Sequence, residues 1–122
     1  MKKTLLAAAA GAVLGALFVA VAWAQQEAPA YVLAQINIHD ADRYSKYGAE
    51  FGPIFARHEG QGVAFSEAPH VLEGEWDYGR TVVLRFNSKE AALAWYNDPD
   101  YQRIVKHRWA ASDANIILIE GR

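Results

Sequence analysis

The side chains best suited to chemistry lie within residues 71–102, where charged and aromatic residues stand close together. If residues 76–79 form a four-residue turn between antiparallel strands, Glu75 lies opposite Arg80, and Glu73 lies further in on the same face. Glu73 would then be partly removed from water and able to act as a general acid or base, or to anchor a ligand. The alternative is that these glutamates and Arg80 form only cross-strand ion pairs.

Arg108 occupies a position that helical periodicity assigns to an apolar face, beside Ile104, Val105 and Trp109. A guanidinium held there could grip a ligand carboxylate through two parallel hydrogen bonds. Alternatively, its aliphatic stem covers the core while its charged head reaches water or a carboxylate of the protein. The candidate catalytic or anchoring residues are therefore Glu73, Arg80 and Arg108.

Aromatic residues accompany these charges, and four of them are expected to line a ligand pocket: Tyr44, Trp76, Trp95 and Tyr101. Tyr47 and Tyr96 add to the same aromatic surface. Each buried hydroxyl or indole N–H needs a hydrogen-bond partner, which a bound ligand or water supplies. The alternative is ordinary packing in a core or a dimer interface.

The sequence predicts neither a metal site nor a cofactor site. The four histidines, His39, His58, His70 and His107, lack the spacing that places two ligands on one helix or strand. Without cysteine, thiolate chemistry and thiolate metal sites are excluded. The chain also lacks the G-x-S-x-G elbow of serine hydrolases and a phosphate-binding glycine loop. His107 adjoins Arg108 and is the best placed for acid–base work, although an exposed helical histidine fits the pattern too.

The first residues predict the compartment. Lys2 and Lys3 precede an uncharged run over residues 4–24, which ends in Ala22-Trp23-Ala24. Small residues at these positions are typical of a signal peptide cleaved after Ala24, so residues 1–24 are predicted to be a leader. The mature protein is therefore expected to be periplasmic or secreted.

The alternative for this segment is an uncleaved membrane anchor. The apolar run approaches the roughly 20 residues that span a bilayer, and Gly11 and Gly15 form a G-x-x-x-G pair, which can pack membrane helices. The membrane would be a partner only in that case.

The predicted leader carries two of the twelve Lys and Arg and none of the fourteen Asp and Glu. Its removal leaves 98 residues with a formal charge of −4, enough for one domain with a modest core. A mildly acidic domain without a basic run argues against nucleic acid as a partner. Residues 25–30 are interpreted as a polar linker, and residues 31–122 as the folded domain.

Hydrophobic patterning predicts strands over residues 31–38, 63–66, 80–86 and 115–120, with residues 70–75 as a further piece of the second strand or its neighbour. Helices are expected after Asp40, Ser88 and Asp98, each a good N-cap. Gly52-Pro53 weakens or bends the first helix, which ends before Gly60.

The order strand, helix, strand, strand, helix, strand is the split βαβ pattern of an α+β, ferredoxin-like protomer. Its antiparallel sheet carries helices on one face only. The apolar residues on both faces of the last strand indicate that a second copy covers the other face, so we expect a homodimer.

Three stretches resemble the domain-of-unknown-function 1330 family: YVLAQINIHDADRY, VLEGEWDYGRTVVLRFNSKEAALAWYNDPDYQ and the closing ILIEG. The resemblance covers residues 31–121, and its most specific parts are LEGEW with Arg80, FNSKEAALAWYNDPDYQ and Arg108. It implies a dimeric α/β barrel, with a cavity between sheet and helices or within the shared barrel. It implies no reaction, because relatives in the superfamily include monooxygenases, isomerases and haem-dependent enzymes. The exported leader departs from the family's usual pattern.

The residues and the resemblance together favour an exported domain that binds an unknown small molecule and could be an enzyme without a metal. The alternative is a non-catalytic periplasmic accessory or stress-related protein that acts through its dimer surface. Cofactor-independent oxygenase chemistry is a third hypothesis, which would need an electron-rich substrate.

Overall fold

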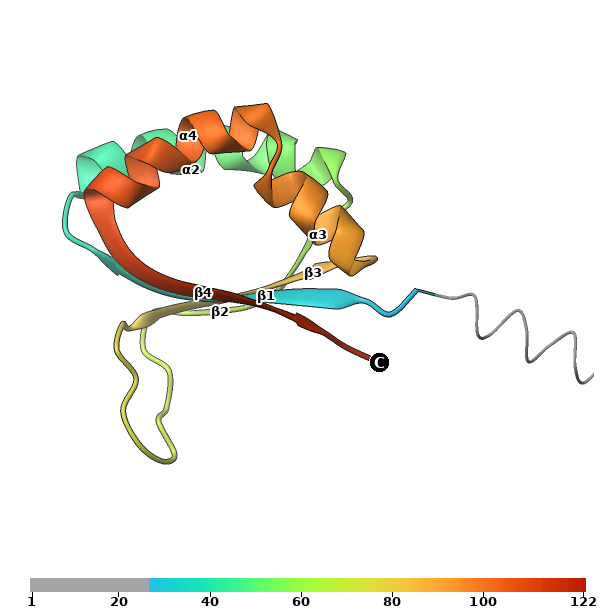
Figure 1. The fold of residues 1–122 in the computed structure, drawn as a ribbon. Helices are drawn as coiled ribbons and strands as arrows, with labels where there is room; N and C mark the ends of the chain where they lie inside the picture. Colours follow the sequence, from blue (N-terminus) through green and yellow to red (C-terminus); the bar gives the residue numbers. More distant parts are fainter. Residues whose placement is uncertain (1–26) are drawn as a thin grey trace, which may run out of the picture.

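The computed structural model describes residues 27–122, in which four strands and three helices follow one another (Figure 1). The strands are β1 (Ala30–Ile38), β2 (Gln61–Ser66), β3 (Arg80–Phe86) and β4 (Ser112–Glu120), and the helices are α2 (Ala41–Arg57), α3 (Lys89–Tyr96) and α4 (Pro99–Ala111). The predicted leader, residues 1–24, lies outside the described residues. None of the helices within residues 27–122 has the length and apolarity of a membrane span.

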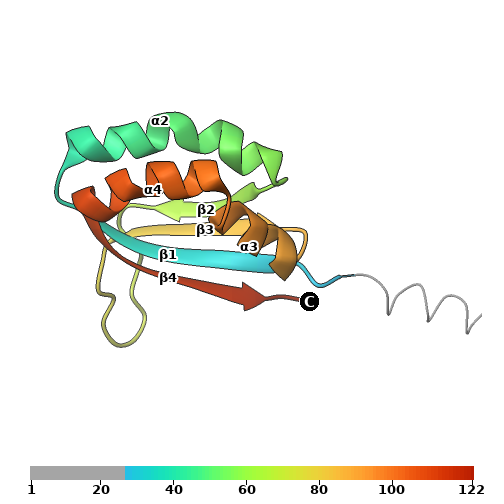
Figure 2. The same cartoon turned by 45° about the horizontal axis from the view of Figure 1, so that its top comes forward.

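The strands form one antiparallel sheet in the order β2-β3-β1-β4 (Figure 2). β1 is central, so that Val32 pairs with Leu84 of β3 on one side and with Leu118 of β4 on the other. The three helices lie on one face of this sheet (Figure 1). The structure confirms the α+β, ferredoxin-like protomer that the element order predicts.

The core forms where one face of the sheet meets the helices. Val32, Ala34 and Ile36 of β1 are buried, as are Leu84 and Phe86 of β3. The residues between them point to the opposite face, because successive side chains of a strand alternate. Alternating apolar residues therefore place β1 and β3 at the centre of a sheet with one covered face.

The three predicted N-caps are confirmed. Asp40, Ser88 and Asp98 each accept a hydrogen bond from a backbone N–H of the following first turn, at 2.8–3.1 Å. Each cap satisfies one of the amide donors that a helix start leaves without a partner. Pro99 occupies the first turn of α4, where its missing N–H costs no helical hydrogen bond.

α2 continues through Pro53, near the place where the sequence predicts a weak or bent helix. Tyr47 and Ile54 lie on either side of Gly52-Pro53, and both are buried. Packing of this face stabilises the helix across the proline, which intrinsic propensity alone disfavours.

The segment between β2 and β3 contradicts the prediction. Residues 70–75 form no strand, and residues 67–79 are an irregular loop instead of a four-residue turn. β3 already pairs with β1 along one edge and with β2 along the other, so it offers no edge to residues 70–75. Pro69 lacks an amide donor and Gly74 has a φ of 74°, which also interrupts extended backbone. The loop projects from the sheet on the side away from the helices (Figure 1).

Asp98 joins the end of α2 to the start of α4. Its Oδ2 accepts hydrogen bonds from His58 Nε2 and from Arg57 Nη2, both at 2.7 Å. These two hydrogen bonds, that from His58 first, hold the pKa of the Asp98 carboxyl well below its ordinary range. The carboxylate thus tethers two helices that form the layer above the sheet.

Protonation of Asp98 is therefore expected to weaken the fold in acid. The folded-state pKa lies below the unfolded value of about 3.9, so the stabilisation is present above that value and is lost as the pH falls through the folded-state pKa. Urea denaturation of Asp98→Asn should give a lower free energy of unfolding than wild type at neutral pH, and the two should converge in strong acid. A difference that stays constant at every pH would exclude the charge as its cause.

Candidate functional site

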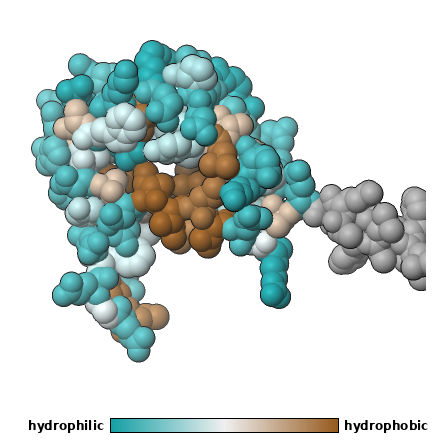
Figure 3. Space-filling model, in the orientation of Figure 1, coloured by the Kyte–Doolittle hydropathy of each residue, from teal (hydrophilic) through white to brown (hydrophobic). Residues whose placement is uncertain are grey.

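A cavity of about 300 Å³ lies between the helices and the sheet. Val32, Ile36 and Leu84 supply its aliphatic wall on the sheet side. Figure 3 shows apolar side chains gathered in a hollow between the helix layer and the sheet. Its volume falls at the small end of the range of ligand-binding pockets, so it suits a molecule of one or two rings.

The helices supply an aromatic wall. Tyr44, Tyr47 and Phe51 line the cavity from one face of α2, at positions i, i+3 and i+7. Trp95 of α3 and Tyr101 of α4 complete the wall, with ring centroids 4.4 Å apart. Because these rings pack against one another, the wall is formed before any ligand arrives.

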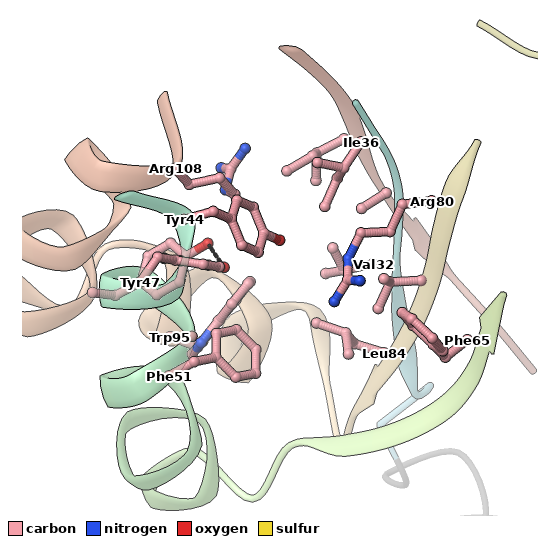
Figure 4. Close-up of a pocket in the computed structure, with 15 residues that line it drawn as sticks. Val32, Ile36, Tyr44, Tyr47, Phe51, Phe65, Arg80, Leu84, Trp95 and Arg108 are labelled. Atoms are coloured by element: carbon pink, nitrogen blue, oxygen red, sulfur yellow. Dashed lines mark hydrogen bonds between the residues drawn. The ribbon is translucent and has the colours of Figure 1, made fainter. Parts of the chain in front are cut away.

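Two buried phenols form a polar pair within this wall. The hydroxyl oxygens of Tyr47 and Tyr101 are 2.9 Å apart, and their hydrogen bond is dashed in Figure 4. Burial raises the pKa of both tyrosines, that of Tyr47 well above its ordinary value, so both stay protonated at neutral pH. One hydroxyl donates to the other, which leaves a single O–H of the pair free to donate to another group.

Arg80 enters the cavity from β3. Its guanidinium carbon lies 4.6 Å from the centroid of the Phe65 ring and 5.6 Å from that of Tyr44. Its Nη1 donates to Glu67 at the start of the loop, while its buried Nε has no hydrogen-bond partner. Figure 4 shows its side chain extending from the sheet towards the helices. Aromatic rings and one carboxylate thus hold this cation at the edge of the cavity.

Arg108 reaches the cavity from α4 and is only 3% exposed. Its guanidinium carbon lies 5.7 Å from the centroid of the Tyr47 ring, and its buried Nε has no hydrogen-bond partner. Within residues 27–122, no carboxylate oxygen lies within 4 Å of its nitrogens. Arg108 is therefore a buried cation without a counterion in the part of the chain that the structure describes.

The structure brings five of the seven predicted site residues to this one cavity: Tyr44, Arg80, Trp95, Tyr101 and Arg108. Trp76 lies elsewhere, since its Nε1 donates to Thr81 Oγ1 at 2.9 Å and it borders a hollow with Leu33 and Ile117. The side chain of Thr81 alternates with those of the core-facing positions of β3, which places Trp76 on the uncovered face of the sheet.

The expected position of Glu73 is wrong. Glu73 and Glu75 are exposed in the irregular loop, and neither lines the cavity. The prediction paired residues 70–75 with β3, whereas β2 occupies that edge and sets Phe65 opposite Val82. Glu67, which the sequence did not single out, is the residue that pairs with Arg80.

Phe51 and Phe65 are cavity residues that were not predicted as such. The helical spacing of Phe51 indicates a buried face, but it does not tell a filled core from a cavity wall.

Among the histidines, His58 binds Asp98 outside the cavity, and His107 is partly buried with its Nδ1 unpaired. Within residues 27–122, no three potential ligands cluster in a way that could hold a metal ion.

Comparisons with solved structures show the same fold. A protein of unknown function from Rhodopseudomonas palustris is 25% identical with a TM-score of 0.68, over 87% of this chain and 92% of that chain. A dabb family protein with a ferredoxin-like fold from Mesorhizobium loti is 14% identical with a TM-score of 0.54, over 79% and 99%. SnoaB, a cofactor-independent oxygenase from Streptomyces nogalater, is 18% identical with a TM-score of 0.51, over 78% and 94%.

No curated protein matches the chain at a significant level. The model of a protein family does match, over residues 29–122, which include every described strand and helix. The family is described as a domain of unknown function, DUF1330. The resemblance in the sequence is thereby confirmed, and the chain belongs to the DUF1330 family.

Proposed function

We propose that this protein binds a small molecule in the cavity between its helices and its sheet. The observation that carries the proposal is a cavity of about 300 Å³ whose wall combines packed aromatic rings with two guanidinium groups. Ligand sites have this composition, a mostly apolar lining with a few convergent polar groups. A cavity left by imperfect core packing would be apolar, whereas this one holds Arg108 in its wall at the cost of burying a charge.

Binding is better supported than acid–base catalysis. The described residues that line the cavity include neither a carboxylate nor an imidazole, and their buried tyrosines have raised pKa values. A general base must lie within reach of the proton that it removes and have a pKa near the working pH. The oxygenase from Streptomyces nogalater shares the fold at 18% identity, which supports no assignment of its reaction to this chain.

The binding protein is proposed to work as an exported homodimer. The uncovered face of the sheet exposes Ile117 and Ile119 of β4 at 55% and 47%, and Trp76, 43% exposed, borders the same hollow as Ile117. Large apolar side chains that gather on one face mark an interaction surface, and a second copy of the same sheet would cover them. Export rests on the leader-like pattern of residues 1–24.

Gly48 allows the cavity to be filled without breaking a contact. It borders the cavity on α2, and a Cβ added there would meet no atom within 4 Å. Gly48→Leu is expected to raise the free energy of unfolding, by up to about 1 kcal/mol from helix propensity, and to abolish ligand binding. Ala49→Leu, at the next and exposed position of α2, is the matched control and should still bind.

Two measurements test these variants. Native mass spectrometry of protein purified from its own host should show a reproducible small excess of mass, which Gly48→Leu loses and Ala49→Leu keeps. Isothermal titration calorimetry with 2-naphthoate and with 2-naphthalenemethanol measures the affinity of each variant for a probe directly. If wild type shows no excess of mass and binds neither probe, the proposal is wrong, and the alternative of a protein that acts through its dimer surface gains support.

A further inference from the structure

We propose that the ligand is a planar, apolar molecule that carries one carboxylate, and that Arg108 pairs with this carboxylate. The inference rests on the proposed function and narrows it to one chemical class of ligand. Its basis is the set of polar groups that the cavity presents, their charges and the shape of the wall.

The unpartnered groups around the cavity are donors. Among the described residues, four buried side-chain polar atoms lack a hydrogen-bond partner, and three belong to residues that line the cavity: Arg80 Nε, Trp95 Nε1 and Arg108 Nε. Each of these nitrogens carries a hydrogen and accepts none. Buried donors without partners are rare in folded proteins, so three of them within one cavity wall mark that wall as rich in donors. These three atoms are covered by the wall itself, and the direct contact with a ligand falls to groups that face the cavity.

The phenols and the guanidinium of Arg108 complete this donor set. The hydrogen bond between Tyr47 and Tyr101 uses one of their two hydroxyl protons, so the other is free to donate. The hydroxyl of Tyr44 points towards the middle of the cavity (Figure 4). A carboxylate has two oxygens that accept several hydrogen bonds, and it matches the planar fork of Arg108 with two parallel N–H···O bonds.

The charges select an anion with one negative charge. Glu67 already compensates Arg80, whereas no described carboxylate compensates Arg108. One positive charge therefore remains inside the cavity, and a single carboxylate neutralises it. A phosphate monoester carries about −1.5 to −2 at pH 7, and it would bring an excess negative charge into an apolar space, which is costly.

The wall selects a flat apolar body. Phe51 and Trp95 present rings on the helix side, and their centroids lie 6.1 Å apart at an interplanar angle of 78°. Val32 and Leu84 present aliphatic surface from the sheet. An aromatic ring placed between these surfaces stacks or meets ring edges at little cost in conformational entropy. A carboxylate attached to such a ring would reach Arg108 at the end of the cavity.

Three probes with one naphthalene ring system test the inference. Isothermal titration calorimetry is carried out with 2-naphthoate, 2-naphthalenemethanol and 2-naphthyl phosphate. Wild type is expected to bind 2-naphthoate at least about tenfold more tightly than either of the other probes. A charge-assisted hydrogen bond between Arg108 and the carboxylate contributes free energy of this size. In Arg108→Met this preference should disappear while 2-naphthalenemethanol still binds, which also shows that the variant is folded.

Arg103→Met is the matched control on the same helix. Arg103 is exposed and pairs with Glu50 at 3.1 Å, so its removal should leave the preference for 2-naphthoate unchanged. Arg108→Lys, which keeps the charge without the planar fork, should keep only part of the preference. If Arg103→Met loses the preference for 2-naphthoate to the same degree as Arg108→Met, the preference reflects a general charge effect and the inference is overturned.

The outcomes separate the two proposals. Equal affinity of wild type for 2-naphthoate and 2-naphthalenemethanol would overturn the carboxylate inference and leave small-molecule binding standing. Tighter binding of 2-naphthyl phosphate would overturn the selection of a single negative charge. Failure of all three probes, together with no co-purified mass, would overturn both.

Discussion

Replacing Arg108 with methionine is expected to raise the free energy of unfolding of the ligand-free protein by about 1–3 kcal/mol. Arg108 is 3% exposed, its Nε has no partner, and no carboxylate within residues 27–122 compensates it. Methionine keeps an unbranched apolar stem against the core and removes the buried charge. The same change should abolish the preference for an anionic ligand.

Urea denaturation of the ligand-free variant measures this effect, with Arg103→Met as the control. An exposed ion pair contributes little, so the control should change the free energy of unfolding by no more than about 0.5 kcal/mol. A loss of several kcal/mol in Arg108→Met would mean that Arg108 is stabilising, as it would be if the assembled protein supplied its counterion. A gain in stability with a loss of binding is the mark of a residue kept for function at a cost to the fold.

The elements of the fold could be predicted because their signals are local. Asp40, Ser88 and Asp98 begin the three helices, and each needs only a nearby backbone N–H to act as a cap. The alternation of β1 and β3 is likewise read within a few residues. Local signals of this kind were enough to give the order of elements, and with it the ferredoxin-like topology.

The candidate site could be predicted only in part, because its geometry depends on pairing between distant segments. Helical periodicity predicts that Arg108 and Trp109 both lie on the apolar face of their helix. Arg108 is buried as predicted, whereas the neighbouring Trp109 is 51% exposed. The assumption of a short hairpin predicts Glu75 opposite Arg80 and Glu73 further in on the same face, and the order of strands rules that hairpin out. Whether aromatic residues fill a core or surround a cavity depends on the distance between layers, which no local pattern encodes.

The partner of Arg80 shows the same limit at the level of one residue. Glu67 lies 13 positions before Arg80 and meets it because the antiparallel register that pairs Ser66 with Thr81 sets Glu67 opposite Arg80. A loop of this length has no register that the sequence fixes. The charge balance of the cavity, from which the single negative charge of the ligand is inferred, therefore needed the structure.

Ile117→Glu is expected to convert a dimer into a monomer. Ile117 is 55% exposed on the face of the sheet away from the helices, and it alternates with Ile116 and Leu118, which pack against the core. If a second copy covers this face, the substitution buries a carboxylate among apolar side chains in each protomer, and the interface repeats that cost by symmetry. Size-exclusion chromatography with light scattering should give two chains for wild type and one chain for the variant.

Trp109→Glu is the matched control for the dimer, because Trp109 is 51% exposed on α4, in the helix layer. It should leave the mass at two chains.

The loop of residues 67–79 lies on the same side of the molecule as the uncovered face, and its Leu72 is 87% exposed (Figure 1). A dimer would give this side chain an apolar partner, so Leu72→Ser should weaken association. The effect should be smaller than that of Ile117→Glu, because serine removes an apolar contact without burying a charge. If wild type is a monomer at every concentration tested, the apolar face of β4 has another occupant, and the homodimer is excluded.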